Sequence, residues 1–258
     1  MSSPQPLLGK VALITGAGSG IGKAMAHTFS ASGAHVIVND VNDVGGETVA
    51  KEIGGIFLKA DLADMNQTRQ LCKDAITSAG RVDILVNNAG FQNMSPVDEF
   101  PDEIWMKMVH VMLVAPFQTT KYLLPSMKEH GWGRIINISS IHGLVASPFK
   151  SAYISAKHGL IGLTKTVALE VGQHGITVNA ICPGFVRTPL VEGQITNQAN
   201  LNNLTEEEVV EKIMLEPAAI KHLIEPSEIA GLARFLASDE ARSITGASYS
   251  IDLGWTAR

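Results

Sequence analysis

The stretch "VALITGAGSGIGKAM", Val11–Met25, combines three local patterns in a row. It begins with an apolar run typical of a buried strand, passes through Gly16, Gly20 and Gly22, and continues with helical spacing. Glycines let the backbone turn tightly and approach a pyrophosphate, whose charge the N-terminus of a helix favours. A strand, a glycine loop and a helix in this order predict a dinucleotide-binding site.

Asp40, at the end of the next predicted strand, supports this interpretation. A carboxylate at this place binds the ribose 2′-hydroxyl of a dinucleotide and repels a 2′-phosphate. No Arg or Lys stands in the loop before Gly22, and Val41 follows the acid. The sequence therefore predicts NAD(H) rather than NADP(H), the alternative being that Asp40 only caps the turn.

Similar apolar runs recur along the chain and alternate with helical patterns. Runs that are apolar on both faces are typical of a parallel sheet covered by helices on both sides. The predicted strands are Lys10–Gly16, Ala34–Asp40, Gly55–Leu62 (the weakest), Val82–Gly90, Gly133–Ser140 and Gly175–Gly184. With helical spacing between them, as at Ile21–Ser32 and Met65–Ala79, they predict an α/β, Rossmann-type, doubly wound parallel sheet. No linker rich in Pro, Gly or Ser divides the chain, so residues 1–258 are expected to form a single domain.

The composition argues against several other classes of protein. The chain has 258 residues, is 45% hydrophobic and carries a net charge of −5 without a basic run, which suits a folded core and not a nucleic-acid surface. The N-terminus does not resemble a signal peptide, and no apolar run approaches the ~18 residues of a membrane span. Cys72 and Cys182 lie far apart and show no metal-ligand spacing. We therefore expect a cytoplasmic protein with reduced cysteines and no metal.

A polar segment follows the last predicted strand, at about residues 188–217. Within it, Thr205 and Glu208 have the spacing of a capping box for a short helix. A helical excursion beyond the carboxyl end of a strand is where an α/β fold would place a substrate lid. We predict a small helical lid here, the alternative being a surface hairpin without a functional role.

Tyr153 and Lys157 lie one helical turn apart in the segment "SAYISAKHGLIGLTK". Alcohol oxidation needs a base that removes the hydroxyl proton as hydride leaves the carbon, and a free tyrosine, with a pKa near ~10, is too weak for this at neutral pH. A lysine cation about 4 Å away contributes roughly 4 kcal/mol at an effective dielectric of ~20, which would lower the pKa of the phenol by about 3. Ser140, at the end of a predicted strand, can polarise the substrate oxygen. Ser140, Tyr153 and Lys157 are the predicted catalytic residues.

Together these motifs resemble the short-chain dehydrogenase/reductase family over essentially the whole chain. The motifs that carry the resemblance are Thr15-Gly-x-x-x-Gly-x-Gly22, Asn87-Asn-Ala-Gly90, Ser140, Tyr153-x-x-x-Lys157, and Pro183-Gly184 followed by Thr188. The resemblance implies a nicotinamide-dependent oxidoreductase with the tyrosine as general acid and base. Cofactor contacts are expected at Gly16, Ser19, Gly20, Ile21, Gly22, Asp40, Asp61, Leu62, Asn88, Ala89, Gly90, Tyr153, Lys157, Pro183, Gly184, Val186 and Thr188.

A narrower resemblance is to family members that interconvert (R)-3-hydroxybutyrate and acetoacetate with NAD. It rests on "NNAGFQ", "GWGRIINISSIHGLVAS", "KSAYISAKHG", "NAICPGFVRTPLVEGQI" and "LGWTAR". It implies that Gln92, His142, Lys150 and Gln194 bind the carboxylate of a small substrate, alongside Ser140 and Tyr153. Trp255 is expected to close the pocket, a core position being the alternative. The family is commonly tetrameric, so a homotetramer is expected.

One position departs from the family pattern. Many members carry a catalytic asparagine where alignment on Trp105 and Phe117 places Met112. Because methionine has no amide, a proton relay from Lys157 is expected to use the Met112 backbone carbonyl and a water molecule. Met112→Asn should then change the turnover rate only modestly in a spectrophotometric assay. A large gain in rate would show instead that the native relay is impaired.

Two other functions share part of this pattern. A reductase of another small ketone or of a 3-oxoacyl thioester has the same Ser, Tyr and Lys, but a thioester reductase usually prefers NADP and needs room for a long acyl carrier. Asp40 and the cluster around Lys150 argue against it. A redox-sensing protein would bind NAD(H) without turnover, which an intact catalytic set argues against. We therefore expect an NAD-dependent dehydrogenase acting on a small carboxylate.

Overall fold

A computed structural model describes residues 5–257, apart from the side chains of residues 197 and 201; residues 1–4 and 258 of the predicted domain lie outside it. Within this range, seven parallel strands form one sheet in the order β3-β2-β1-β4-β5-β6-β7. The strands are β1 Val11–Thr15, β2 His35–Asp40, β3 Ile56–Lys59, β4 Ile84–Asn87, β5 Gly133–Ile138, β6 Ile176–Pro183 and β7 Ser248–Ile251. The predicted doubly wound parallel sheet is confirmed.

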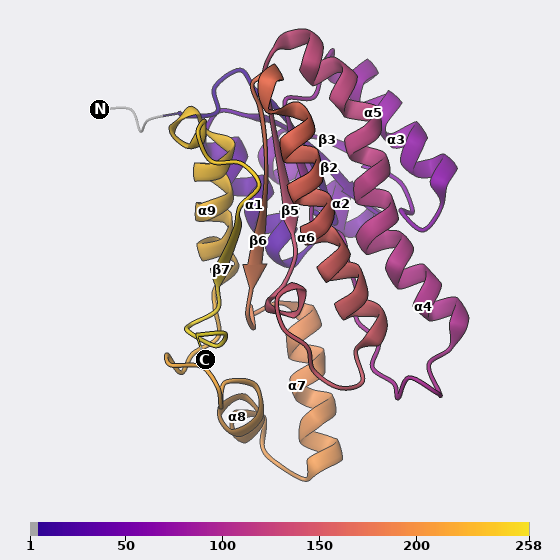
Figure 1. Cartoon of the computed structure of the whole chain (residues 1–258), viewed down its shortest axis with the longest axis vertical. Helices are drawn as coiled ribbons and strands as arrows, with labels where there is room; N and C mark the ends of the chain where they lie inside the picture. Colours follow the sequence, from indigo (N-terminus) through magenta and orange to yellow (C-terminus); the bar gives the residue numbers. More distant parts are fainter. Residues whose placement is uncertain (1–4, 258) are drawn as a thin grey trace.

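Helices cover both faces of this sheet (Figure 1). They are α1 Gly20–Ala31, α2 Asp43–Ile53, α3 Met65–Ala79, α4 Asp102–Val109, α5 Ala115–His130, α6 Ser151–Val171, α7 Pro189–Asn202, α8 Glu206–Val209 and α9 Pro226–Ala237. Figure 1 shows α1 and α9 on one side of the sheet and α3, α4 and α5 on the other. Helices α7 and α8 stand beyond the end of the sheet, where β6 finishes.

The central strands are buried because each packs against two hydrophobic cores. In β1, Ala12 and Ile14 belong to a core that includes Phe29 of α1, whereas Leu13 belongs to a second core that includes Leu123 of α5. Successive side chains of a strand point to opposite faces of the sheet. The unbroken apolar run of β1 therefore reflects helices on both faces.

The sequence does not predict β7. Its four residues, Ser248–Ile251, include two serines and are only partly buried at the edge of the sheet, so they lack the apolar run of a central strand. The strand is defined by its parallel pairing with β6, which aligns Ala180 with Ser248. That pairing depends on the whole preceding fold and leaves little trace in local sequence.

The order of the strands determines where a ligand would bind. From β1 the chain turns outward to β2 and β3, and it then returns to β4 on the other side of β1. In an open α/β sheet, ligands bind beyond the carboxyl ends of the strands at such a switch point. Gly16 follows β1 and Asn88 follows β4, so both lie at this place.

Two further expectations concern cysteines and membranes. Cys72 and Cys182 are both free and buried, so they form no disulfide. Between residues 5 and 257 no helix is long and apolar enough to cross a membrane.

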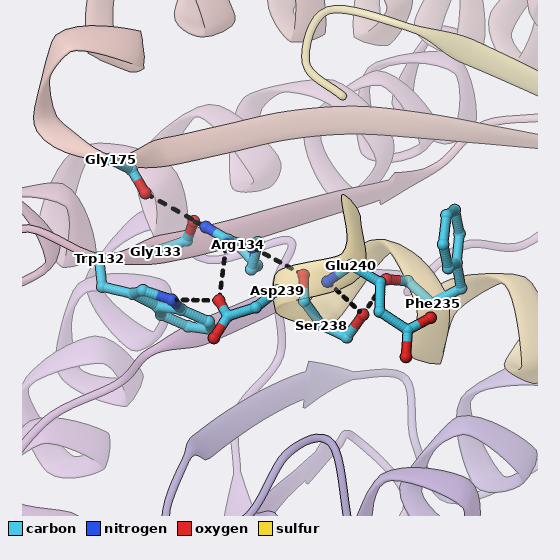
Figure 2. Close-up of polar contacts among 8 residues, drawn as sticks. All are labelled: Trp132, Gly133, Arg134, Gly175, Phe235, Ser238, Asp239 and Glu240. Atoms are coloured by element: carbon cyan, nitrogen blue, oxygen red, sulfur yellow. Dashed lines mark hydrogen bonds and ion pairs between the residues drawn. The ribbon is translucent and has the colours of Figure 1, made fainter. Parts of the chain in front are cut away.

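A buried arginine, Arg134, lies at the amino end of β5 and links this strand to the segments before β6 and after α9 (Figure 2). The side chain of Arg134 is 3% exposed, and its guanidinium donates to the carbonyl oxygens of Gly133 at 2.8 Å, Gly175 at 3.2 Å and Ser238 at 3.4 Å. It also forms an ion pair of 3.1 Å with Asp239, whose side chain is 72% exposed. Because water screens the exposed carboxylate, the three carbonyl contacts matter more than the ion pair.

Replacing Arg134 with Met should lower the free energy of unfolding by about 2–4 kcal/mol, because buried carbonyl oxygens lose their donor. Asp239→Asn is the matched control. It removes the charge but keeps an oxygen for the Trp132 indole, which donates to Asp239 at 2.9 Å, so a change below ~1 kcal/mol is expected. Chemical denaturation at fixed protein concentration measures both values. Equal losses for the two variants would contradict this assignment of the stability to the carbonyl contacts.

Candidate active site

A cavity of about 520 Å³ lies beyond the carboxyl ends of the central strands. All but one of the predicted cofactor contacts line it: Gly16, Ser19, Gly20, Ile21, Asp40, Asp61, Leu62, Asn88, Ala89, Gly90, Tyr153, Lys157, Pro183, Gly184, Val186 and Thr188. The exception is Gly22, which is buried in α1 behind the loop. A Cβ atom on Gly22 would lie 2.2 Å from the Gly16 carbonyl oxygen, so its role is to allow close packing of the loop on the helix.

Gly16 makes the tight turn that the sequence predicts. Its φ of 62° lies in the left-handed region, and a Cβ atom there would lie 2.8 Å from the Cα of Ala89. Both features exclude a side chain at this position. The glycine loop therefore forms a backbone cradle that leaves room for a pyrophosphate.

Asn88, which lines the larger cavity, also fixes the glycine loop. Its side-chain amide donates to the carbonyl oxygens of Thr15 at 2.9 Å and Gly16 at 3.0 Å. The Thr15 hydroxyl in turn accepts from the backbone N–H groups of Asn88 at 3.0 Å and Ala89 at 3.1 Å. Both amide hydrogens of Asn88 are thus used to join the end of β4 to the glycine loop. The contribution of Thr15 was not predicted from the sequence.

The Asp40 carboxylate also holds the backbone of the glycine loop. One carboxylate oxygen accepts from Gly18 N–H at 2.9 Å, and the other accepts from Asn42 N–H at 2.9 Å. A carboxylate has about four acceptor sites, so these two bonds leave capacity for the hydroxyls of a ribose. The fixed negative charge at the wall of the cavity disfavours a phosphate at the same place.

Asp40→Ala should shift cofactor preference from NAD toward NADP by about 10–100-fold in the ratio of the two kcat/KM values. The reason is that the variant loses hydrogen bonds to the ribose, worth roughly 1.5–3 kcal/mol, and the repulsion of a 2′-phosphate. Steady-state kinetics with both cofactors measures the ratio. Asp43→Ala is the control, because Asp43 pairs with Lys59 on the surface and is absent from the cavity wall. An unchanged ratio in Asp40→Ala would mean that the acid only caps the turn.

A smaller cavity of about 60 Å³ adjoins the first. It is lined by Gln92, Ser140, Ile141, His142, Lys150, Tyr153, Gly184, Phe185, Leu190, Val191 and Gln194. The two cavities share Ser140, Tyr153, Gly184, Leu190 and Val191. The structure therefore gathers the predicted carboxylate-binding residues Gln92, His142, Lys150 and Gln194 around the predicted catalytic pair.

The predicted catalytic residues lie in the loop after β5 and in α6. Ser140, which follows β5, accepts a hydrogen bond from the His142 N–H at 3.1 Å, and its hydroxyl also hydrogen-bonds with Tyr153. Tyr153 and Lys157 lie in α6, with the Lys157 ammonium 5.5 Å from the centre of the Tyr153 ring. That ammonium donates to the Ile138 carbonyl oxygen at 2.7 Å. Lysine has three N–H donors, so two remain for other partners.

Among the protein's own groups, Lys157 does not lower the pKa of Tyr153, so that prediction is wrong. Burial raises the pKa of the phenol, and a hydrogen bond with Ser140 lowers it only in part. Burial also lowers the pKa of Lys157 to about 8. The low polarity that surrounds both groups disfavours the phenolate and the ammonium alike, an effect that the helical spacing of the two residues could not reveal.

Charge in the smaller cavity is carried by Lys150 alone. Burial, followed by the charges of Lys150 and His158, lowers the pKa of His142 to about 4, so the imidazole is neutral at neutral pH. Burial also lowers the pKa of Lys150, which forms no ion pair within residues 5–257. The buried Oε1 atom of Gln92 has no hydrogen-bond partner there either. The Lys150 cation suits a small anion, whereas the free Gln92 oxygen is an acceptor and suits a donor group of a ligand.

Trp255 lies behind the cavity and does not line it. Its ring packs edge-on against His142, with 6.2 Å between ring centroids, and its indole N–H donates to the Met214 carbonyl oxygen at 3.3 Å. The residue therefore joins His142 to the segment after α8. Closure of the pocket by Trp255 stays a prediction.

The segment predicted as a lid contains α7, α8 and a π-helical turn at Val210–Met214. Thr188 caps α7 by accepting from Val191 N–H at 3.4 Å, and the predicted capping box of Thr205 and Glu208 is present. Helix α7 carries Gln194 to the smaller cavity. This placement brings the segment to the site, and its motion stays a prediction.

The region before α5 holds Met112, which the sequence singled out, and two cavity residues that sequence reasoning did not find, Lys107 and Val111. Met112 is fully buried in a π-helical turn, His110–Val114, and its sulfur approaches Gly90. Such turns recur at functional sites. Lys107 and Val111 also line the larger cavity. They are one helical turn apart, but only the packing of α4 and the π-helical turn against α6 decides that this face points to the cavity.

Comparison with known proteins defines the class of this protein. The family model for the short chain dehydrogenases matches residues 10–199, a range that contains the glycine loop, Ser140, Tyr153 and Lys157. The chain belongs to the short-chain dehydrogenase family, and hence to the oxidoreductases that use a nicotinamide cofactor. The glycine cradle, the large cavity and Asp40 fit such a cofactor.

Individual relatives narrow the comparison. The chain is 48% identical to the D-beta-hydroxybutyrate dehydrogenase of Rhizobium meliloti (strain 1021) over 96% of this chain and 99% of that protein. It is 42% identical to the D-beta-hydroxybutyrate dehydrogenase of Cupriavidus necator over 98% of this chain and 100% of that protein. The crystal structure of levodione reductase matches with a TM-score of 0.90 and 32% identity, covering 97% of this chain and 99% of that one.

Proposed function

We propose that this protein interconverts (R)-3-hydroxybutyrate and acetoacetate with NAD(H) as cofactor. The observation that carries the proposal is the cavity of about 60 Å³ beside Tyr153. It combines the unpaired cation of Lys150 with amide and imidazole groups from Gln92, Gln194 and His142. A small substrate with a carboxylate a few bonds from a reactive oxygen satisfies both ends of this site, and 3-hydroxybutyrate has that form.

The chain's own residues supply the proton chemistry and the positioning. When bound, the nicotinamide exchanges a hydride with the substrate carbon. The Tyr153 hydroxyl donates a proton to the substrate oxygen during reduction and removes it during oxidation. Ser140, which lines the same cavity, donates a hydrogen bond to the same oxygen in place of its bond with Tyr153. The positive charge of an oxidised nicotinamide would favour the phenolate and so offset the effect of burial on the pKa of Tyr153.

The preference for NAD over NADP is supported by Asp40, whose carboxylate lies at the cavity wall. Lys150, bound to the substrate carboxylate, would hold the substrate in one orientation. A single orientation supports transfer to one face of the carbon, and so the (R) form that the family resemblance implies.

The test is a spectrophotometric assay of NADH oxidation with three substrates: acetoacetate, an acetoacetyl thioester and an uncharged ketone such as butanone. We expect acetoacetate to have the highest kcat/KM. A preference for butanone would overturn the carboxylate assignment, and a preference for the thioester would favour the alternative reductase. Absence of turnover with all three, despite NADH binding, would favour a sensor.

We also propose a homotetramer in the cytoplasm. Apolar side chains on outer helices support an assembly: Met106 of α4 is 61% exposed, Phe117 of α5 is 48% exposed and Leu169 of α6 is 88% exposed. Exposed apolar surface of this kind is typical of protein interfaces. Sedimentation equilibrium would give the mass of the assembly, and a monomer at micromolar concentration would contradict the proposal.

A further inference from the structure

Ser147 lies in the loop between β5 and α6 and contacts a substrate-cavity residue without lining the cavity. Its hydroxyl forms a short hydrogen bond with Nε2 of His142. The loop that carries both residues also contains Ser140 and Lys150, so it supplies much of the proposed carboxylate site. Neither the family motifs nor the cavity walls give Ser147 a role.

His142 can donate from only one ring nitrogen. His142 is 5% exposed and its imidazole is neutral at neutral pH, and a neutral imidazole has one N–H group and one lone pair. An N–H group attracts a carboxylate, whereas a lone pair repels it. The position of this single proton therefore decides whether His142 helps or hinders the binding of an anion.

The surroundings of the ring make the two nitrogens inequivalent. Tyr153 packs edge-on against the imidazole with 6.3 Å between centroids, and Trp255 does so at 6.2 Å, which restrains ring rotation. Nε2 is engaged by Ser147, whereas Nδ1 has no hydrogen-bond partner among residues 5–257. A hydroxyl proton from Ser147 on Nε2 leaves the ring proton on Nδ1.

We propose that Ser147 is a positioning residue: its hydroxyl donates to Nε2 of His142 and keeps the ring proton on Nδ1, free to donate to a carboxylate. The inference rests on the proposed function for the chemistry of the ligand. It adds a residue that acts through His142 and does not touch the substrate. In general, a hydrogen bond at one imidazole nitrogen determines whether the other nitrogen carries the proton.

The loop is built to hold Ser147 in place. Two residues further on, Phe149 has a φ of 66°, which is rare for a bulky residue. Its carbonyl oxygen accepts from Ser95 N–H at 2.9 Å, which links this loop to the segment that carries Gln92. On the other side, Val145 N–H donates to the Ile141 carbonyl oxygen at 3.0 Å. A backbone held in a sparsely populated conformation next to a binding site is a sign of positioning.

The direct test is the tautomer of His142 in the full chain without substrate. Two-bond 1H–15N correlation spectra distinguish Nδ1–H from Nε2–H rings, and His142→Gln assigns the signal among the eight histidines. We expect the Nδ1–H form in the wild type and in Ser147→Thr, and a shift toward Nε2–H in Ser147→Ala. An Nε2–H ring in the wild type, or an unchanged tautomer in Ser147→Ala, would overturn the proposal.

Kinetics provide the second test. Ser147→Ala should raise the KM for acetoacetate about 3–10-fold, the range that one neutral hydrogen bond provides, and should change kcat and the KM for NADH less. Ser147→Thr should restore the KM. Ser151→Ala is the matched control, because its buried hydroxyl in the same region makes no hydrogen bond. A loss confined to kcat would contradict the inference.

The two tests separate this inference from the proposed function. If acetoacetate is not a substrate but the tautomer depends on Ser147, the function fails and the positioning role stands. If acetoacetate is turned over but the tautomer ignores Ser147, only the positioning role fails.

Discussion

Tyr153→Phe should lower kcat for acetoacetate reduction by about 10²–10⁴-fold, the range that a positioned general acid contributes. The substitution removes one hydroxyl and keeps the ring, which packs against His142. The cavity should therefore keep its shape, and binding of both substrates should change little. The loss is expected in kcat because proton transfer occurs in the transition state.

Two measurements give this result its meaning. The dissociation constant of NADH, measured by fluorescence, should stay within about threefold of the wild type, which shows that the cofactor site is intact. Tyr122→Phe is the control, since this tyrosine lies on α5, where it contacts Arg69, and lines neither cavity. Turnover of Tyr153→Phe near the wild-type rate would mean that another group moves the proton.

The fold follows from local signals in some segments and only from packing in others. β1 and α1 are recognisable because the glycine loop between them needs backbone conformations that few sequences permit. The capping box at Thr205 and Glu208 is equally local, since it depends on two residues one turn apart. β7 has no such local signal: the partly buried Ser248–Ile251 becomes a strand only because it pairs with the edge of β6.

The same distinction applies to the site. Asp40, Ser140 and Tyr153 follow or lie near the carboxyl ends of strands, and parallel strands bring those ends together, so their convergence on one edge of the sheet is predictable. Ser147 ends a stretch that carries the narrower resemblance but is given no role by it, and Lys107 belongs to no motif, so only the folded loop or helix places them. The pKa of Tyr153 is missed for another reason, because it depends on burial, which neighbours in the sequence do not reveal.

Lys150→Met should reduce kcat/KM for acetoacetate by about 10²–10³-fold. Loss of one partner from a buried, hydrogen-bonded charge pair costs about 2–5 kcal/mol, because the other charge is left without compensation. Here the remaining charge would be the substrate carboxylate, next to a neutral His142 and two amides. Methionine keeps the length and most of the volume of the side chain, so the shape of the cavity should persist.

Comparing a charged and an uncharged ketone with this variant tests whether Lys150 recognises a carboxylate. An uncharged ketone has no carboxylate, so its kcat/KM should change less than about threefold in Lys150→Met, and the preference for acetoacetate should fall accordingly. Lys165→Met is the control, since Lys165 is an exposed lysine of the same helix. An equal loss for charged and uncharged ketones would mean that Lys150 only supports the start of α6. A selective loss would mean that this partly buried cation, which has no ion-pair partner within residues 5–257, recognises the carboxylate.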